Sequence, residues 1–218
     1  MTSTLDSAPI APLIADLYAK ADASHLHVKS GATPLGDRDA SVQERADAAE
    51  DRYLPIDPGT GRLLYSLIRA ARPETVVEFG TSYGISTLHL AAAVRDNGIG
   101  HIYTTEANAK KIASARATFA QAGVDDIITV LEGDALRTLT AVTDPIGFVL
   151  LDGWKDLYLP LIKLLEPQLI PGALVAADNA DSSGARDYLD RVRDSANGYT
   201  SFNFPAKERD SMELSSRN

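Results

Sequence analysis

The chain has 218 residues, of which 44% are hydrophobic and 23% charged, and its formal net charge of -9 fits an ordinary globular domain. The acidic balance argues against nucleic acids and anionic membranes as partners, and the absence of cysteine excludes disulfides, thiolate metal sites and a cysteine nucleophile. No apolar run is long enough to cross a bilayer and the N-terminus lacks the pattern of a signal peptide, so we expect a cytoplasmic protein that acts on a small molecule.

We divide the chain into an N-terminal helical segment, residues 1–52, and a larger region, residues 53–218, and expect both to belong to one domain. In the first segment, apolar residues recur at helical spacing in Pro9–Lys20, and a second helix is predicted over Ala40–Arg52. The larger region begins with a predicted helix at Gly59–Arg72.

From residue 75 onward, short runs rich in β-branched residues alternate with helical segments. The predicted strands are Thr75–Phe79, His101–Thr105, Ile127–Leu131, Ile146–Leu151 and Ala173–Ala177. The predicted helices are Ile85–Arg95, Ala107–Ala122, Ala135–Val142, Asp156–Leu165 and Asp181–Ser195. This alternation predicts an α/β, Rossmann-like fold with a mostly parallel sheet covered by helices on both faces. Two further runs, Tyr199–Phe204 and Ser211–Ser215, predict an antiparallel C-terminal hairpin, which makes seven strands.

In open α/β sheets, ligands bind at the carboxyl ends of the strands, so polar residues there are site candidates. Glu78 is the last polar residue of the first predicted strand, which is followed by GTSYG, in which Gly80 permits a tight turn against a ligand. Ser86 falls in the first turn of the next helix, where a carboxylate can bind. The turn either holds a ligand or merely reverses the chain. It matches neither a phosphate-binding P-loop nor the dinucleotide G-x-G-x-x-G pattern, because Ser82 stands at the second glycine.

The second and third strands also end in acidic residues. Glu106 is placed to accept hydrogen bonds from two ribose hydroxyls, or to cap the following helix. Asp134 is placed to accept from an adenine amino group, although a helix cap is the favoured interpretation. Both interpretations stay open for each residue.

The segment FVLLDGWKDLYLP follows the fourth strand and carries most of the candidate chemistry. Asp152 ends that strand, and Asp178 and Asn179 end the next, so the three should converge. Two carboxylates and an amide oxygen are ligands that suit Mg²⁺, or Mn²⁺ or Ca²⁺. The alternative interpretation is that the two acids only cap helices.

Lys155 lies one helical turn after Asp152 and can serve as a general base, or be an ordinary surface lysine. Trp154 either walls an aromatic pocket or belongs to the core.

Taken together, these segments resemble the metal-dependent class I O-methyltransferases that include catechol O-methyltransferase. The matching pieces are VVEFGTSYGIS, TTEAN, EGDA, LLDGWKDLYLP and GALVAADNA, in family order over roughly residues 55–180. DGWKDLYLP is the most specific piece. A terminal hairpin after five parallel strands is also the usual ending of a methyltransferase sheet. In the catechol enzyme a histidine stands where this chain has Gly153, which changes the packing against adenine.

The resemblance implies a role for each candidate residue. Glu78, Gly80 and Ser86 would line the methionine part of S-adenosylmethionine, Glu106 would bind the ribose, Asp134 and Ala135 would lie by the adenine, and Asp152 would also border the cofactor. The metal ligands would be Asp152, Asp178 and Asn179, the base would be Lys155, and the substrate would contact Trp154, Lys155 and Asn179.

The reaction implied is methyl transfer to a hydroxyl of a catechol-like phenol that chelates a divalent metal. Relatives of this kind include both monomers and homodimers, and their N-terminal region often shapes the entrance of the site, so the resemblance implies this role for residues 1–52. Two other classes remain as alternatives: a nicotinamide-dependent oxidoreductase, which the glycine turn and Glu106 would also suit, and a cofactor-binding module without catalysis. The missing dinucleotide spacing, the terminal hairpin and the three oxygen ligands speak against the first alternative. The intact Lys155 and ligand positions speak against the second.

Overall fold

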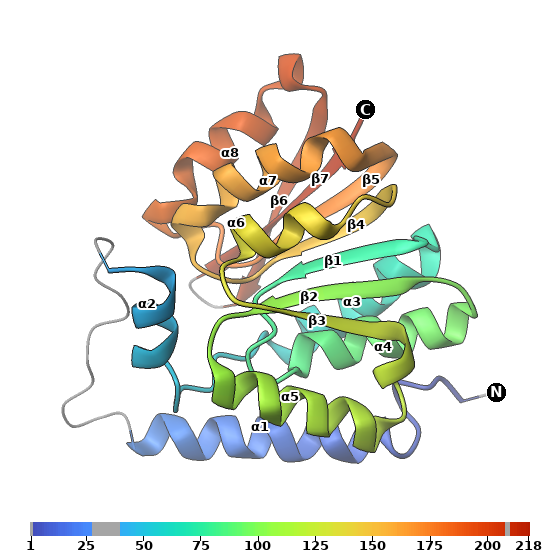
Figure 1. Ribbon diagram of the computed structural model, residues 1–218. Coiled ribbons are helices and arrows are strands. Elements are labelled where there is room, and N and C mark those ends of the chain that lie inside the picture. Colours follow the sequence, from blue (N-terminus) through green and yellow to red (C-terminus); the bar gives the residue numbers. More distant parts are fainter. Residues whose placement is uncertain (1, 28–39, 208–209) are drawn as a thin grey trace.

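The computed structural model describes residues 2–27, 40–207 and 210–218, the side chains of residues 25–27, 206 and 207 excepted. A seven-stranded sheet with the order β3-β2-β1-β4-β5-β7-β6 forms the centre of the molecule (Figure 1). The strands are β1 Thr75–Phe79, β2 His101–Glu106, β3 Ile128–Glu132, β4 Ile146–Leu151, β5 Leu169–Ala177, β6 Tyr199–Lys207 and β7 Asp210–Arg217. β1 to β5 pair in parallel, whereas β7 is antiparallel to both β5 and β6. The predicted parallel sheet with a terminal antiparallel hairpin is confirmed.

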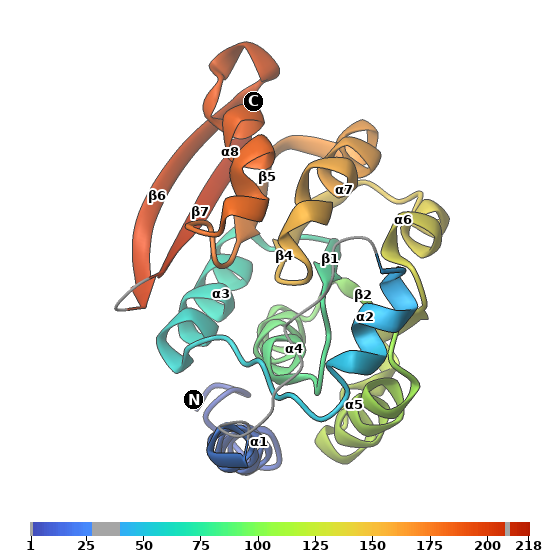
Figure 2. The same ribbon diagram turned by 90° about the vertical axis from the view of Figure 1, so that its left-hand side faces the viewer.

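Helices cover both faces of this sheet, as predicted (Figure 1). One face carries α1 Ile10–His27, α3 Pro58–Ala71, α4 Ile85–Asn97 and α5 Ala109–Ala122, and the other carries α6 Ala135–Thr138, α7 Tyr158–Leu165 and α8 Arg186–Arg193. The short helix α2, Val42–Ala48, lies beyond the carboxyl ends of the strands, toward the viewer in Figure 2. None of the helices in the described ranges is long and apolar enough to span a membrane.

Two apolar clusters, one on each face, form the core. Successive residues of β1 point to opposite faces, so Val76 belongs to one cluster and Val77 to the other. The N-terminal helix α1 places Ile10, Ile14 and Leu17 in the first cluster, against α4. The N-terminal segment therefore shares a core with the sheet.

Several predicted helices are shorter than the sequence pattern indicates: the predicted Ala40–Arg52 holds α2 alone, and the predicted Asp181–Ser195 holds a 3₁₀ turn, Ser183–Ala185, and α8. The segment 135–142 forms α6 and then a 3₁₀ turn, Leu139–Ala141, because β-branched residues and the following Asp144-Pro145 disfavour a longer α-helix. Likewise, α7 is preceded by a 3₁₀ turn, Lys155–Leu157. Pro160 stands in the first turn of α7, where its missing N–H is tolerated.

The carboxyl ends of β1 and β4 approach each other closely at Gly80. This glycine has φ +109°, and a Cβ added to it would lie 2.9 Å from backbone atoms of Asp152 and Gly153. Backbone atoms cannot swing aside as a flexible side chain can, so only glycine fits here. Gly98 offers a comparison, because it also has a positive φ, +66°, but no atom lies within 4 Å of its added Cβ.

We expect Gly80→Ala to lower the free energy of unfolding by about 2–4 kcal/mol, since it adds overpacking to backbone strain. Gly98→Ala carries the strain alone and should cost about 1 kcal/mol. Urea unfolding of both variants measures the difference. Equal losses would show that the contact between β1 and β4 is not as tight as described.

Candidate active site

The carboxyl ends of three neighbouring strands are held level with one another. Phe79 of β1 is in register with Leu151 of β4, and Leu151 with Ala177 of β5. The pairing continues past the strands, because the N–H of Asp152 donates to the Phe79 carbonyl at 2.9 Å and that of Asp178 to the Leu151 carbonyl at 2.9 Å. β1 and β4 flank the point where the strand order reverses, which is where open α/β sheets bind ligands. A cavity of about 850 Å³ opens at this point.

The glycine turn after β1 forms one wall of the cavity. Gly80 lines both the main cavity and a smaller adjoining recess, and Ser86 lines that recess at the start of α4. Ser82 adopts a left-handed conformation, φ 48°, within the turn. The predicted glycine turn thus borders a cavity beside a helix N-terminus, where an anionic group is favoured.

Glu78 lies beneath this turn. Its side chain is fully buried (0% exposed) and accepts hydrogen bonds from Thr87 and Thr104, each at 2.5 Å. Burial raises the pKa of the Glu78 carboxyl, against the lowering effect of hydrogen bonds from Ser86, Thr104 and Thr87. Glu78 is not among the residues that line the two described pockets, and it lies in the buried layer next to the glycine turn.

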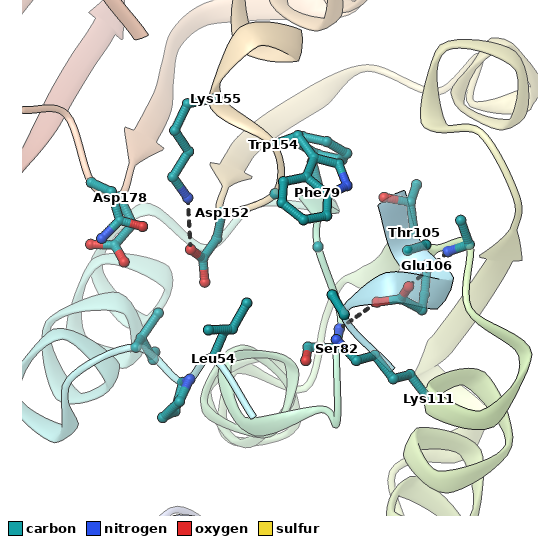
Figure 3. A pocket seen from close by; sticks show the side chains of 18 of the residues that line it. Leu54, Phe79, Ser82, Thr105, Glu106, Lys111, Asp152, Trp154, Lys155 and Asp178 are labelled. Atoms are coloured by element: carbon teal, nitrogen blue, oxygen red, sulfur yellow. Dashed lines mark hydrogen bonds and ion pairs between the residues drawn. The ribbon is translucent and has the colours of Figure 1, made fainter. Parts of the chain in front are cut away.

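Glu106 is fixed on the opposite side of the turn. One carboxylate oxygen accepts from the Ser82 N–H at 3.0 Å, and the other from the N–H groups of Ala107 and Asn108, both at 2.9 Å (Figure 3). The helix cap is Asn108, whose side chain accepts from the Lys111 N–H at 3.0 Å. Glu106 is therefore not the cap of α5, and its carboxylate lines the cavity.

Asp134 takes the role that the sequence favoured. It caps α6 by accepting from the Leu136 N–H at 3.0 Å. Its neighbours Gly133 and Ala135 line the cavity, whereas Asp134 itself is not among the lining residues. The structure thus brings Ala135 to the predicted adenine region and leaves Asp134 at its border.

Asp152 and Lys155 form an ion pair inside the cavity. Lys155 Nζ lies 3.6 Å from Asp152 Oδ1, and the two side chains are 18% and 10% exposed (Figure 3). The ammonium also lies 5.3 Å from the ring centre of Tyr158, whose hydroxyl donates to the Asp178 carbonyl at 3.0 Å. The lysine is thus held at the cavity wall and is not an ordinary surface lysine.

Asp178 and Asn179 line the same cavity as Asp152. Asp178 is 1% exposed, and Figure 3 shows its side chain across from Asp152. Asn179 has φ 56°, and its amide nitrogen donates to Asp210. Because the nitrogen is engaged in this way, the amide oxygen is the atom left to serve as a ligand. Within the described ranges no group of three or more histidines and carboxylates could hold a metal ion, so the ligand set of Asp152, Asp178 and Asn179 stays a prediction.

The cavity is also lined by Arg45 of α2, which sequence analysis missed. Its guanidinium donates to both Asp156 oxygens, at 2.8 and 2.9 Å, and lies 4.6 Å from the ring centre of Trp154. Arg45 is only 6% exposed. The partner lies 111 positions away, so no local pattern signals the pair.

Two more lining residues were not predicted. Lys111 of α5 is buried, and burial lowers the pKa of its ammonium, which lies 5.7 Å from the ring centre of Tyr83. Phe79, at the end of β1, contributes its ring to the cavity wall (Figure 3). A lysine in a helix is ordinarily expected to be exposed and an apolar strand residue to belong to the core, so only the packing of the strands and helices brings Lys111 and Phe79 to the cavity.

The charged residues that line the cavity are mostly acidic. The carboxylates are Asp22, Asp57, Glu106, Asp152, Asp156 and Asp178, and the cations are Arg45, Lys111 and Lys155. A concave surface with this excess of negative charge favours a positively charged ligand.

Comparison with known proteins places this site in a family. Residues 77–180 match a family model described as a methyltransferase domain. A protein of Mycobacterium tuberculosis described as a probable O-methyltransferase is 31% identical over 191 residues, which cover 83% of this chain and 80% of that protein. Catechol O-methyltransferase B of Danio rerio is 34% identical over 142 residues, or 62% of this chain and 53% of that protein. The match thus spans about half of the zebrafish protein.

Solved structures have the same fold. A cofactor-bound protein from Mycobacterium tuberculosis superposes with a TM-score of 0.70 at 25% identity, over 98% of this chain and 94% of that one. An O-methyltransferase from Bacillus cereus, in complex with SAH, superposes with a TM-score of 0.68 at 19% identity, over 93% of this chain and 100% of that one. These relationships support the methyltransferase interpretation and not the nicotinamide-dependent alternative. The chain belongs to the family of S-adenosylmethionine-dependent O-methyltransferases that includes catechol O-methyltransferase.

Proposed function

We propose that the protein transfers a methyl group from S-adenosylmethionine to one hydroxyl of a catechol-like small molecule that is chelated by a divalent cation. The observation that carries this proposal is the convergence of Lys155, Asp152 and Asp178 in one cavity, beside the glycine turn and Glu106. The acidic lining supports it, because both a sulfonium cofactor and a metal ion are cations.

The donor set fits a hard divalent cation. Asp152 and Asp178 supply carboxylate oxygens and Asn179 an amide oxygen, which is the ligand chemistry of Mg²⁺, with Mn²⁺ and Ca²⁺ as alternatives. The hydrogen bond from the Asn179 amide nitrogen to Asp210 orients this side chain for such a role. Two vicinal hydroxyls of a substrate and water would complete the coordination.

The side chains of this chain then act in distinct ways. When bound, S-adenosylmethionine supplies an electrophilic methyl group, and a divalent cation supplies charge that favours the ionised hydroxyl. For this role the Lys155 ammonium first releases a proton to solvent, and the amine then accepts the proton of the attacking hydroxyl at its Nζ. Asp152, 3.6 Å away, is placed to stabilise the ammonium that forms. Glu106 orients the cofactor by accepting hydrogen bonds from the ribose hydroxyls. The proximity of the reacting groups and the fixed charges around them then accelerate methyl transfer.

We also infer that the N-terminal segment, residues 1–52, forms the entrance cap of the same domain. Arg45, Ala46 and Ala49 line the cavity, and the Arg45–Asp156 pair ties α2 to the turn that carries Lys155. A cap of this kind excludes water from the reacting groups.

Lys155→Ala should lower kcat by about 10²–10⁴-fold, because it removes the general base. The dissociation constant of S-adenosylhomocysteine should change little. Steady-state kinetics and isothermal titration calorimetry measure the two quantities. Lys163→Ala, on the exposed side of α7, is the matched control. A near-normal kcat in Lys155→Ala would refute the base assignment.

Asp178→Asn should weaken Mn²⁺ binding at least about tenfold, because a charged ligand is replaced by a neutral one of the same shape. Electron paramagnetic resonance of free Mn²⁺, with S-adenosylhomocysteine and catechol present, gives the affinity. Asp181→Asn removes an exposed carboxylate nearby and should leave it unchanged. Equal Mn²⁺ affinity in the two variants would contradict the metal site.

A further inference from the structure

Position 153 has no room for a side chain. A Cβ added to Gly153 would lie 2.4 Å from the Cε1 and Cζ atoms of Phe79 and 2.9 Å from its Cδ1. Real Cβ atoms do not approach other atoms so closely. The ring of Phe79 thus fills the space that a side chain at position 153, such as the histidine of the catechol enzyme, would enter.

The strands and a neighbouring ring hold Phe79 in this place. The residue ends β1 in register with Leu151, directly before the tight approach at Gly80. Its ring meets that of Tyr158 edge to face, with centres 6.3 Å apart and planes at 80°. Tyr158 is fully buried, so it forms a rigid support on one side of Phe79.

The rest of the Phe79 ring borders the cavity. The side chain is 6% exposed and lines the cavity together with Trp154 and Ala135. In Figure 3 the Phe79 and Trp154 rings lie above the carboxylate of Glu106. This part of the wall is apolar, in contrast to the acidic part around Asp152 and Asp178.

If the proposed function is correct, the two ends of the cofactor are already placed. Glu106 marks the ribose, and the recess lined by Gly80 and Ser86 marks the methionine end. The purine must then lie on the far side of the ribose, where Gly133 and Ala135 leave space. A flat apolar ligand gains most from an aromatic wall at such a place.

We propose that Phe79 is the aromatic wall on which the adenine ring of the cofactor packs, in place of a side chain at position 153. This assignment rests on the proposed function, since it takes S-adenosylmethionine as the ligand. In this assignment Phe79 and Gly153 depend on each other. The Phe79 ring occupies the space beside Gly153, and the absence of a side chain at position 153 leaves room for that ring.

The test uses two ligands and three variants of the full chain. The ligands are S-adenosylhomocysteine and 5′-methylthioadenosine, which has the same nucleoside but no amino-acid group. The variants are Phe79→Leu, Gly153→Ala and the double substitution, with dissociation constants measured by calorimetry. A thermal melt of each variant confirms that it folds.

Phe79→Leu should weaken both ligands by the same factor, about tenfold, because only the nucleoside end loses its wall. Gly153→Ala should also weaken both, since its Cβ displaces the ring. In the double variant the clash is absent, so its loss should be smaller than the product of the two single losses. Ser86→Ala, at the methionine end, provides the contrast: it should weaken S-adenosylhomocysteine more than 5′-methylthioadenosine.

Wild-type affinity for both ligands in Phe79→Leu would overturn the assignment, as would a loss seen with S-adenosylhomocysteine alone. Gly153→Ala provides a second, independent variant if Phe79→Leu does not fold. Failure of the wild-type protein to bind S-adenosylhomocysteine would be a different result. It would overturn the proposed function and this inference together.

Discussion

The alignment of the carboxyl ends of β1, β4 and β5 is the constraint on which the site depends. Parallel pairing sets Phe79, Leu151 and Ala177 level, and the next residues of each strand continue the backbone hydrogen bonds. Buried strands specify their register strongly, because a slip of one residue would exchange side chains between the two core clusters and disrupt the packing of both. Asp152 and Asp178 therefore meet in the cavity as a consequence of core packing.

Local interactions then adjust each functional side chain. The backbone N–H groups of the glycine turn and of the two residues before α5 hold both oxygens of Glu106. Lys155 is confined by Asp152 and the Tyr158 ring. The Arg45–Asp156 pair connects α2 to the same turn. A largely buried ion pair of this kind contributes little net stability, because the cost of desolvating both charges offsets their attraction. The stacked rings of Tyr53 and Tyr83, 3.8 Å apart, hold the chain that follows α2 against the glycine turn.

Much of this architecture follows from local sequence patterns. Thr75–Phe79 and Ile146–Leu151 are strands with the predicted bounds, because each is a short apolar run buried on both faces. The convergence of Asp152, Asp178 and Asn179 followed from strand order alone. Helix lengths were less predictable where 3₁₀ turns replace α-helical ones, as before α7, since the two differ by small energies.

Residues whose role depends on distant contacts escaped the sequence analysis. Phe79 was not among the expected site residues, but strand alternation turns it to the face opposite Glu78, where it lines the cavity. The expected contact of Glu78 with the cofactor stays a prediction. Arg45 meets its partner only in the folded chain. In each case the deciding information is which face of an element a residue occupies and what packs against that face.

Metal-assisted methyl transfer can be tested by an activity assay with and without a chelator. Transfer of a labelled methyl group from S-adenosylmethionine to a panel of catechols is measured with Mg²⁺, after addition of EDTA, and after excess Mg²⁺ is restored. We expect transfer that disappears with EDTA and returns with Mg²⁺. Transfer that is indifferent to EDTA would contradict the metal role of Asp152, Asp178 and Asn179.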